Sequence, residues 1–253
     1  MKAKRSLGQN FFINKNLCKQ ITDLILQENP DVLVEIGPGR GFFTDLLSKG
    51  ESKMLLIEKD NDLSTELSFK FPNIEIKSVD FLEWNLDELD QYKRKRILFF
   101  GSLPYNVSKP IIRKIIKSKH FDTPCYFIIQ KEVADKYLSR EPNNNILSLQ
   151  TQLNANVKRY FNISPESFRP KPKVDSSFVL FSPKENTFTE NSDSFEKFIQ
   201  ICFKQPRKTL KNNLRKVSFK ENQEFDNLLS KRPQQISLNE YILLFSNLKD
   251  LLI

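Results

Sequence analysis

Two short segments carry residues whose types and spacing suit the binding of a nucleoside and of an amine. Residues 35–41 read Glu-Ile-Gly-Pro-Gly-Arg-Gly and directly follow the apolar run 32–34. Residues 102–106 read Ser-Leu-Pro-Tyr-Asn and follow the apolar run 97–100. Glycines after a buried strand let the backbone turn sharply and approach a ligand closely. Together the two segments predict one site for a nucleoside methyl donor and a flat, amine-bearing nucleobase.

The glycine spacing argues against a dinucleotide. The third glycine of residues 35–41 comes two residues after the second, whereas the dinucleotide fingerprint needs three. Arg40 and Phe42 also crowd the start of the next helix, where a pyrophosphate needs free amide groups. A cofactor without phosphates therefore suits Gly37 and Gly39 better, and a dehydrogenase is the weakest of the alternatives.

Acidic residues at two further strand ends complete the expected cofactor site. Glu58 lies 21 residues after Gly37 and ends an apolar run, so its carboxylate can accept hydrogen bonds from both ribose hydroxyls. Asp80 can accept a hydrogen bond from an adenine amino group, and the ring of Phe81 can cover the base. The structural alternative is a capped turn with helix N-caps at Asp60 and Asp80.

The segment 102–106 suits an exocyclic amine on a flat base. An adenine N6 amine is a poor nucleophile because its lone pair is delocalised into the ring. The Ser102 oxygen and the backbone carbonyl of Leu103 or Pro104 can accept both amine hydrogens and so aim the lone pair at a methyl group. The ring of Tyr105 can stack on a base that has left its duplex. Alignment and electrostatic preorganisation then accelerate the transfer without a general base. The structural alternative is a turn before a helix capped by Ser108.

The charge of the chain is compatible with a polyanionic partner. The 40 Lys and Arg residues outnumber 31 Asp and Glu residues, for a net charge of +9. Basic residues without any acid gather in three segments, at residues 1–20, 109–119 and 204–220. Such segments are harder to explain as general solubility than scattered charge, although a solvated face remains the alternative for each one.

Cysteine and histidine usage limits the chemistry further. Cys18, Cys125 and Cys202 are far apart and lack metal-ligand spacing, which favours a reducing compartment. His120 is the only histidine, so the usual serine triad and zinc-bound water are excluded, and we expect no metal. The chain has no apolar run near the roughly 18 residues of a membrane span. We therefore expect a cytoplasmic protein without membrane contact.

Short apolar runs alternate with helical patterns over the first half of the chain. Strands are expected at residues 32–36, 54–57, 74–79, 97–100 and 126–129. Helices are expected from residue 14 or 16 to 28 and over residues 41–48, 62–69, 111–117 and 133–138. This alternation predicts an α/β fold with a parallel sheet and right-handed crossovers.

The pattern changes after residue 139. Two β-rich runs, 158–163 and 174–181, flank a proline-punctuated loop and predict a hairpin-like pair at the edge of the sheet. Residues 182–194 are polar and acidic, as in a linker, and helical periodicity follows from residue 195. We therefore expect a large domain over residues 1–183 and a small all-helical domain over residues 184–253.

Taken together, these motifs and several further segments resemble the ribosomal RNA adenine N6,N6-dimethyltransferases that modify two adjacent adenosines near the 3′ end of small-subunit RNA. The resemblance covers nearly the whole chain. Besides the two motifs, it rests on residues 7–12 (LGQNFF), 130–134 (QKEVA), 168–176 (FRPKPKVDS), 208–214 (KTLKNNL) and 232–237.

The resemblance implies a fold, a methyl donor and the residues that bind it. The fold is a Rossmann-like class I methyltransferase sheet of seven strands with its last pair antiparallel, followed by a small all-helical domain that docks on RNA. The donor is S-adenosyl-L-methionine. Its implied contacts are Asn10, Phe12, Gly37, Glu58 and Asp80. Gly39, Phe81 and Ser102 join them because of their places beside these residues in the two motifs and at the third strand end. The residues expected to be catalytic are those already argued to orient the amine, Ser102, Leu103, Pro104 and Tyr105.

The resemblance also implies a partner, the 16S RNA of the immature small ribosomal subunit at a late step of assembly. The basic segments would then neutralise phosphates while the pocket selects the base. The residues expected to contact RNA are Lys109, Arg113, Arg207, Lys208, Lys211 and Arg215. Nothing in the sequence demands more than a monomer.

Three departures from the family pattern bear on these expectations. Ser102 stands where the family usually has asparagine, and its shorter hydroxyl is a weaker acceptor for the amine. Residues 143–145 are three asparagines in place of tyrosine, glycine and arginine, so one RNA or pocket contact is expected to be missing. Pro206 replaces a second arginine, which removes one phosphate contact but is tolerated in a first helical turn.

Two alternatives remain besides the dehydrogenase. The first is an assembly factor that binds the immature small subunit with weak or no methylation, for which Ser102 is the argument. The intact Glu58 and Asp80 argue against it, because a binding factor does not need them. The second is an enzyme that methylates a large-subunit adenosine and confers antibiotic resistance. Residues 168–176 and 208–214 favour the small-subunit enzyme instead.

Overall fold

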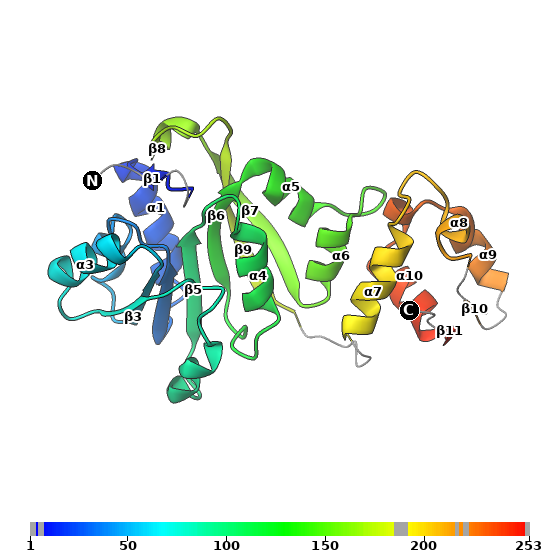
Figure 1. The fold of residues 1–253 in the computed structure, drawn as a ribbon, viewed down its shortest axis with the longest axis horizontal. Helices are drawn as coiled ribbons and strands as arrows, with labels where there is room; N and C mark the ends of the chain where they lie inside the picture. The colour runs from blue at the N-terminus through cyan, green and yellow to red at the C-terminus, as the bar shows by residue number, and fades with distance from the viewer. Residues whose placement is uncertain (1–3, 5–7, 185–191, 216–217, 220–222, 251–253) are drawn as a thin grey trace. The chain divides into compact units, whose positions relative to one another are not determined.

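The computed structural model describes residues 4, 8–184, 192–215, 218–219 and 223–250. Its largest element is a seven-stranded sheet in the order β4-β3-β2-β5-β6-β9-β7 (Figure 1). Strands β2 to β6 are parallel, and β9 runs antiparallel to β6, which confirms the predicted Rossmann-like sheet. The strands of this sheet are β2 (Val32–Ile36), β3 (Lys53–Glu58), β4 (Glu75–Ser78), β5 (Ile97–Ser102), β6 (Cys125–Gln130), β7 (Ala155–Ile163) and β9 (Ser176–Pro183).

Strand β2 lies at the centre of the parallel region because its sequence is suited to burial on both faces. All five of its residues are buried, and it pairs with β3 on one side and β5 on the other. Continuous burial of this kind is typical of parallel strands that helices cover on both faces. Since neighbouring parallel strands point the same way, their carboxyl ends lie at one edge of the sheet.

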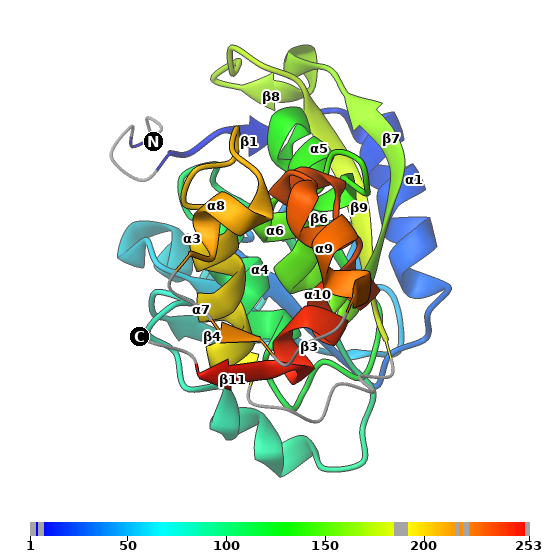
Figure 2. The ribbon, with the colours of Figure 1, turned by 90° about the vertical axis from the view of Figure 1, so that its right-hand side faces the viewer.

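Helices cover both faces of this sheet, with α1 and α4 on opposite sides (Figure 2). Helix α1 begins after its N-cap Asn14, whose side chain accepts a hydrogen bond from the Leu17 N–H at 3.1 Å. The first helix predicted after β2 is shorter than expected, because the glycine turn continues to residue 43. The helices up to residue 138 are α1 (Lys15–Leu26), α2 (Thr44–Leu47), α3 (Asn61–Lys70), α4 (Ser108–Ile116) and α5 (Lys131–Leu138), with the 3-10 helix η2 (Leu86–Tyr92).

A two-stranded pairing that the sequence did not predict joins distant parts of the chain. Strand β1 (Phe11–Phe12) runs antiparallel to β8 (Phe168–Arg169), which follows the 3-10 helix η3 (Pro165–Ser167). The Ile13 N–H extends this pairing by donating to the Ser167 carbonyl at 2.8 Å. The segment before α1 is thereby held against the proline-rich loop that precedes β9.

The chain divides into two compact units, residues 1–134 with 157–183 and residues 135–156 with 184–253. The second unit therefore includes residues 135–156, which the sequence analysis placed with the first domain. It is mainly helical and also contains one short antiparallel strand pair. Among the described residues, no helix combines the length and apolar character needed to cross a membrane. The elements of this unit are α6 (Ile146–Gln152), α7 (Ser192–Cys202), α8 (Leu210–Asn213), β10 (Ser218–Phe219), α9 (Gln223–Ser230), η4 (Pro233–Gln235), α10 (Leu238–Ser246) and β11 (Leu248–Asp250).

The asparagine run at residues 143–145 has a structural role inside the second unit. Asn144 is 2% exposed, and its side-chain amide donates to the Ile236 carbonyl at 2.9 Å. Its side-chain oxygen accepts hydrogen bonds from Ser148 at 3.2 Å and from Gln152 at 3.1 Å. The departure from the family pattern thus places a polar side chain in the interior, where both its amide nitrogen and its oxygen are hydrogen-bonded and it joins α6 to the loop before α10.

We expect Asn144→Ala to lower the free energy of unfolding by about 2 kcal/mol, because it leaves buried hydrogen-bonding groups without a partner. The exposed neighbour Asn143 is the matched control, and Asn143→Ala should change stability by less than about 0.5 kcal/mol. Urea unfolding of the full chain, followed by circular dichroism, measures both. Equal effects of the two substitutions would contradict this role for Asn144.

Candidate active site

The carboxyl ends of four neighbouring strands meet around one pocket. Gly37 follows β2, Glu58 ends β3, Asp80 comes shortly after β4, and Ser102 ends β5; all four line the pocket. Open α/β sheets commonly bind ligands at this edge. The predicted site residues that line the pocket are Asn10, Gly37, Gly39, Glu58, Asp80, Phe81, Ser102, Leu103, Pro104 and Tyr105.

The turn after β2 requires glycine at specific points. Gly37, Gly39 and Gly41 have positive φ angles of 64°, 58° and 71°. A Cβ atom on Gly39 would lie 3.1 Å from the Phe11 ring, and one on Gly41 would lie 2.5 Å from the Phe71 ring. Side chains are therefore excluded for both conformational and steric reasons. The turn presents bare backbone to the pocket, as the sequence predicts.

Glu58 connects this glycine turn to the end of β3. One carboxylate oxygen accepts a hydrogen bond from the Gly39 N–H at 3.1 Å, and the other accepts one from the Asp60 N–H at 2.9 Å. Glu58 is 6% exposed, and burial raises the pKa of its carboxyl group. A carboxylate offers about four acceptor sites, so Glu58 can still accept hydrogen bonds from a ligand.

Asp60 takes the structural role that the sequence analysis offered as the alternative. Its side chain caps α3 by accepting a hydrogen bond from the Asp62 N–H at 3.1 Å. It also accepts hydrogen bonds from Gln9 at 2.9 Å and from the Lys4 ammonium at 2.6 Å. Burial acts to raise the pKa of Asp60, but these hydrogen bonds outweigh it and lower the pKa. The carboxylate thereby fastens the N-terminal segment beside the pocket.

Asp80 combines a structural contact with a position at the pocket. One carboxylate oxygen accepts a hydrogen bond from the Leu82 N–H at 2.9 Å, and the other accepts one from the Lys59 ammonium at 2.6 Å. Burial acts to raise the pKa of Asp80, but these two partners outweigh it, so the carboxylate stays ionised at neutral pH. Phe81 beside it is 3% exposed and lines the same pocket.

The segment after β5 is held in place through backbone and side-chain hydrogen bonds. The Leu103 N–H donates to the Ile128 carbonyl at 3.0 Å, and the Pro104 carbonyl accepts the Val107 N–H at 3.1 Å. The Tyr105 hydroxyl lies 2.8 Å from the Ser176 hydroxyl at the start of β9. These contacts fix the orientation of the Tyr105 ring.

Ser108 is not the N-cap of α4 that the structural alternative required. The helix begins at Ser108 after Val107, which makes no side-chain capping bond. The Ser108 hydroxyl instead donates to the Tyr105 carbonyl at 3.4 Å.

The N-terminal segment contributes residues that the sequence analysis did not select. Phe12, expected at the cofactor, is 5% exposed and packs in the core against Phe43 and Phe168, with ring centroids 4.8 and 5.2 Å away. Phe12 lines a cavity that shares Gly37, Gly39 and Ser102 with the pocket. Its neighbour Phe11 lines the pocket itself, together with Gln9 and Phe168. The two adjacent phenylalanines of β1 alternate between the two faces of the strand, so their roles could be separated only once the strand was known.

Glu35 is buried beneath the glycine turn. It is 2% exposed, and one carboxyl oxygen accepts a hydrogen bond from the Thr44 hydroxyl at 2.7 Å. Burial, together with the charges of Glu58 and Asp45, raises the pKa of Glu35 to about 8. Its carboxyl group therefore carries a proton at neutral pH in the folded protein.

This proton makes stability depend on pH. An unfolded glutamate releases its proton near pH ~4.3, whereas folded Glu35 holds it up to about pH 8. The stabilisation that this proton gives the folded state is therefore fully present below the pKa of Glu35 in the unfolded chain. It is lost as the pH rises through the pKa of Glu35 in the folded protein. Between pH 6 and 8 we expect the free energy of unfolding of wild type to fall by on the order of 2 kcal/mol relative to that of Glu35→Gln. Urea unfolding at each pH measures this difference.

The exposed Glu51 supplies the control for that experiment. Glu51→Gln should follow the wild-type pH dependence throughout. A pH profile of Glu35→Gln that runs parallel to wild type would show that Glu35 is ionised in the fold.

The basic segment 109–119 is less available for RNA than its composition suggests. Lys114 donates to three backbone carbonyls, and Lys119 forms ion pairs with Asp87 and Asp90 at 2.9 and 2.7 Å. Lys109 and Arg113 are exposed on α4.

In the second unit, Arg207, Lys208, Lys211 and Arg215 are exposed. Pro206 lies in the turn before α8 and not in a helix. Lys216 and Lys220 of the basic segment 204–220 lie outside the described residues.

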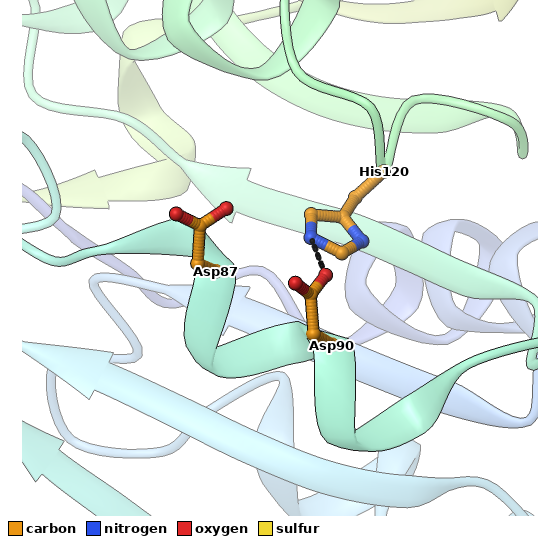
Figure 3. A group of neighbouring side chains, drawn as sticks. All are labelled: Asp87, Asp90 and His120. Carbon is orange, nitrogen blue, oxygen red and sulfur yellow. Dashed lines mark ion pairs between the residues drawn. The ribbon is translucent and has the colours of Figure 1, made fainter.

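A second group of ionisable side chains includes no residue that lines the pocket. Asp87, Asp90 and His120 each offer an atom within 4.8 Å of the others (Figure 3). The His120 Nε2 lies 3.3 Å from Asp90, and the Lys119 ammonium contacts both carboxylates. Because that ammonium already pairs with both carboxylates, we interpret this group as an ion-pair network.

Comparison with known proteins agrees with this geometry. A family model described as "Ribosomal RNA adenine dimethylase" matches residues 1–247. Ribosomal RNA small subunit methyltransferase A of Mycoplasma mobile is 38% identical, over 97% of this chain and 98% of that protein. The protein of the same name from Pelagibacter ubique is also 38% identical, over 99% of this chain and 98% of that protein.

Solved structures show the same fold. A dimethyladenosine transferase from Plasmodium falciparum has a TM-score of 0.78 at 23% identity, covering 92% of this chain and 95% of that one. The 23S rRNA methyltransferase ErmE has a TM-score of 0.72 at 20% identity, covering 94% of this chain and 100% of that one. From the family match and the relatives, this chain belongs to the ribosomal RNA adenine dimethylase family.

Proposed function

We propose that this chain transfers methyl groups from S-adenosyl-L-methionine to N6 of two adjacent adenosines near the 3′ end of small-subunit ribosomal RNA. The observation that carries the proposal is a single pocket lined by the glycine turn, Glu58, Asp80 and residues 102–105. Family membership and the relatives named as small subunit methyltransferases support the same activity. In this proposal the enzyme acts as a cytoplasmic monomer on immature small subunits, late in assembly.

The groups that line the pocket fit S-adenosyl-L-methionine, which when bound supplies an electrophilic methyl group on a sulfonium. Glu58 retains acceptor capacity for the ribose hydroxyls beyond its two backbone partners. Asp80 would accept a hydrogen bond from the adenine amino group, and Phe81 would lie against the ring. Asn10 and the bare backbone of residues 37–41 border the amino-acid end.

Residues 102–105 orient the adenosine amine in this proposal. The Pro104 carbonyl already accepts the Val107 N–H, so the Leu103 carbonyl is the better backbone acceptor, with the Ser102 hydroxyl as the second. The Tyr105 ring, held through Ser176, stacks on the flipped base. Held in this way, the nitrogen lone pair would face the methyl carbon that bound S-adenosyl-L-methionine would supply. The N–C bond would form as the C–S bond breaks, with the electron pair left on sulfur and the amine proton passing to water. The rate comes from alignment and preorganised acceptors.

Exposed cations would hold the RNA without reading its sequence. Lys109 and Arg113 belong to α4, and the others belong to the second unit, residues 135–156 with 184–253, to which we assign docking on the small subunit. Phosphate contacts of this kind position a protein on RNA and release counterions. The proposed cations of the second unit are Arg207, Lys208, Lys211 and Arg215.

A methyl-transfer assay tests the proposed function and the role of Ser102 together. The purified protein is incubated with radiolabelled S-adenosyl-L-methionine and small-subunit particles that lack dimethyladenosine, and the labelled nucleosides are analysed. We expect wild type to form dimethyladenosine near the 3′ end. Ser102→Asn should raise turnover by up to about tenfold, because its amide oxygen reaches further toward the amine.

Ser102→Ala is the matched control and should lower turnover, since it removes the side-chain acceptor. Lower turnover of Ser102→Asn would mean that the pocket has adapted to serine. Particle binding without methyl incorporation by wild type would contradict the proposed function and favour an assembly factor.

A further inference from the structure

Lys114 makes an unusual set of contacts for a lysine in a basic segment. Its ammonium donates hydrogen bonds to the backbone carbonyls of Phe81 at 2.9 Å, Leu82 at 2.8 Å and Trp84 at 2.6 Å. The ammonium also lies 5.5 Å from the centroid of the Phe81 ring. A lysine ammonium has three N–H donors, and all three are used here on one short turn.

The turn that Lys114 holds is the one that carries Asp80 and Phe81 into the pocket. The Glu83 and Trp84 N–H groups of this turn both donate to the Asp80 carbonyl at 2.9 Å. Three carbonyls of the same turn accept hydrogen bonds from Lys114. A single cation therefore satisfies the acceptors that this helical turn leaves open, as basic groups do at helix C-termini.

Lys114 also connects this turn to the segment proposed to orient the amine. It belongs to α4, which begins directly after residues 102–106. Ile111, one helical turn earlier, lines the same pocket. Burial lowers the pKa of Lys114, and the nearby Asp80 opposes this shift.

We propose that Lys114 is a positioning residue that sets Asp80 and Phe81 at the geometry needed to recognise the adenine end of the cofactor. It acts through these two residues. The inference rests on the proposed function, because it assumes that an adenine base occupies this end of the pocket. Without the ammonium, three carbonyls lose their partner. The turn that carries Asp80 and Phe81 is then free to shift relative to the base, even though Leu82 and Lys59 still contact the Asp80 carboxylate.

Calorimetry with two ligands tests this role. S-adenosylhomocysteine carries the 6-amino group, and S-inosylhomocysteine carries a carbonyl oxygen there instead. Wild type should prefer the adenosyl compound, because Asp80 accepts a hydrogen bond from its amino group. We expect Lys114→Met to weaken adenosyl binding by about tenfold while inosyl binding changes little, so that most of the preference disappears.

Lys49→Met is the matched control, since it removes the ammonium of an exposed lysine that lies outside the pocket lining. It should leave both affinities and their ratio unchanged. Equal weakening of the two ligands by Lys114→Met would overturn the inference, since it would indicate a general loss of structure. A preserved preference would overturn it as well.

The same calorimetry separates a failure of the proposed function from a failure of the role of Lys114. If wild type binds neither compound, the proposed function fails, whereas wild-type binding with an unchanged ratio in the variant makes only the role of Lys114 fail. If Lys114→Met does not fold, Lys114→Arg provides the same test, because a planar guanidinium cannot reproduce three converging ammonium bonds. Its adenosyl preference should then fall, and a full wild-type preference would overturn the inference.

Discussion

The carboxylate of Glu58 bridges two turns that belong to different crossovers of the sheet. It accepts the Gly39 N–H from the turn after β2 and the Asp60 N–H from the turn after β3, while it is almost fully buried. A buried carboxylate is stable only when such donors surround it. The glycine turn, the start of α3 and the acceptor proposed for ribose are therefore arranged by one side chain.

The remaining walls of the pocket depend on this arrangement and on contacts across long stretches of sequence. Asp60, next to Glu58, holds the N-terminal segment through Lys4 and Gln9. The pairing of β1 with β8 then places Phe11 against Gly39, where only a glycine leaves room for the ring. Tyr105, which Ser176 holds, also lines the pocket. The pocket is thus assembled from segments that are close only in the folded chain.

The features of the fold and of the site that the sequence predicted are those that short segments of the chain determine. Apolar runs of four to six residues located the parallel strands, and the glycine spacing located the turn after β2, because burial and backbone conformation are local consequences of residue type. The placement of Gly37, Glu58, Asp80 and residues 102–105 at one pocket followed from the parallel direction of the strands.

The parts that could not be predicted depend on partners far along the chain. The position of Phe11 in the pocket beside Phe12 depends on the pairing of β1 with β8. From the sequence, Asn144 indicates only a missing contact. In the fold it is buried, and its side-chain amide donates a hydrogen bond to the Ile236 carbonyl. From the sequence, Lys114 is one of several cations in a basic segment. In the fold its ammonium donates hydrogen bonds to carbonyls of the turn at residues 81–84. The hydrogen-bond partner of a polar side chain cannot be predicted from the sequence when that partner lies tens of residues away along the chain.

Glu58 is the residue on which the proposed cofactor site most directly depends. Titration calorimetry of S-adenosylhomocysteine into wild type and Glu58→Ala measures this, with thermal unfolding to establish that the variant is folded. The account predicts saturable binding at one site in wild type and loss of that binding in a variant that still unfolds cooperatively. Unchanged affinity in Glu58→Ala, or no binding to wild type, would contradict it.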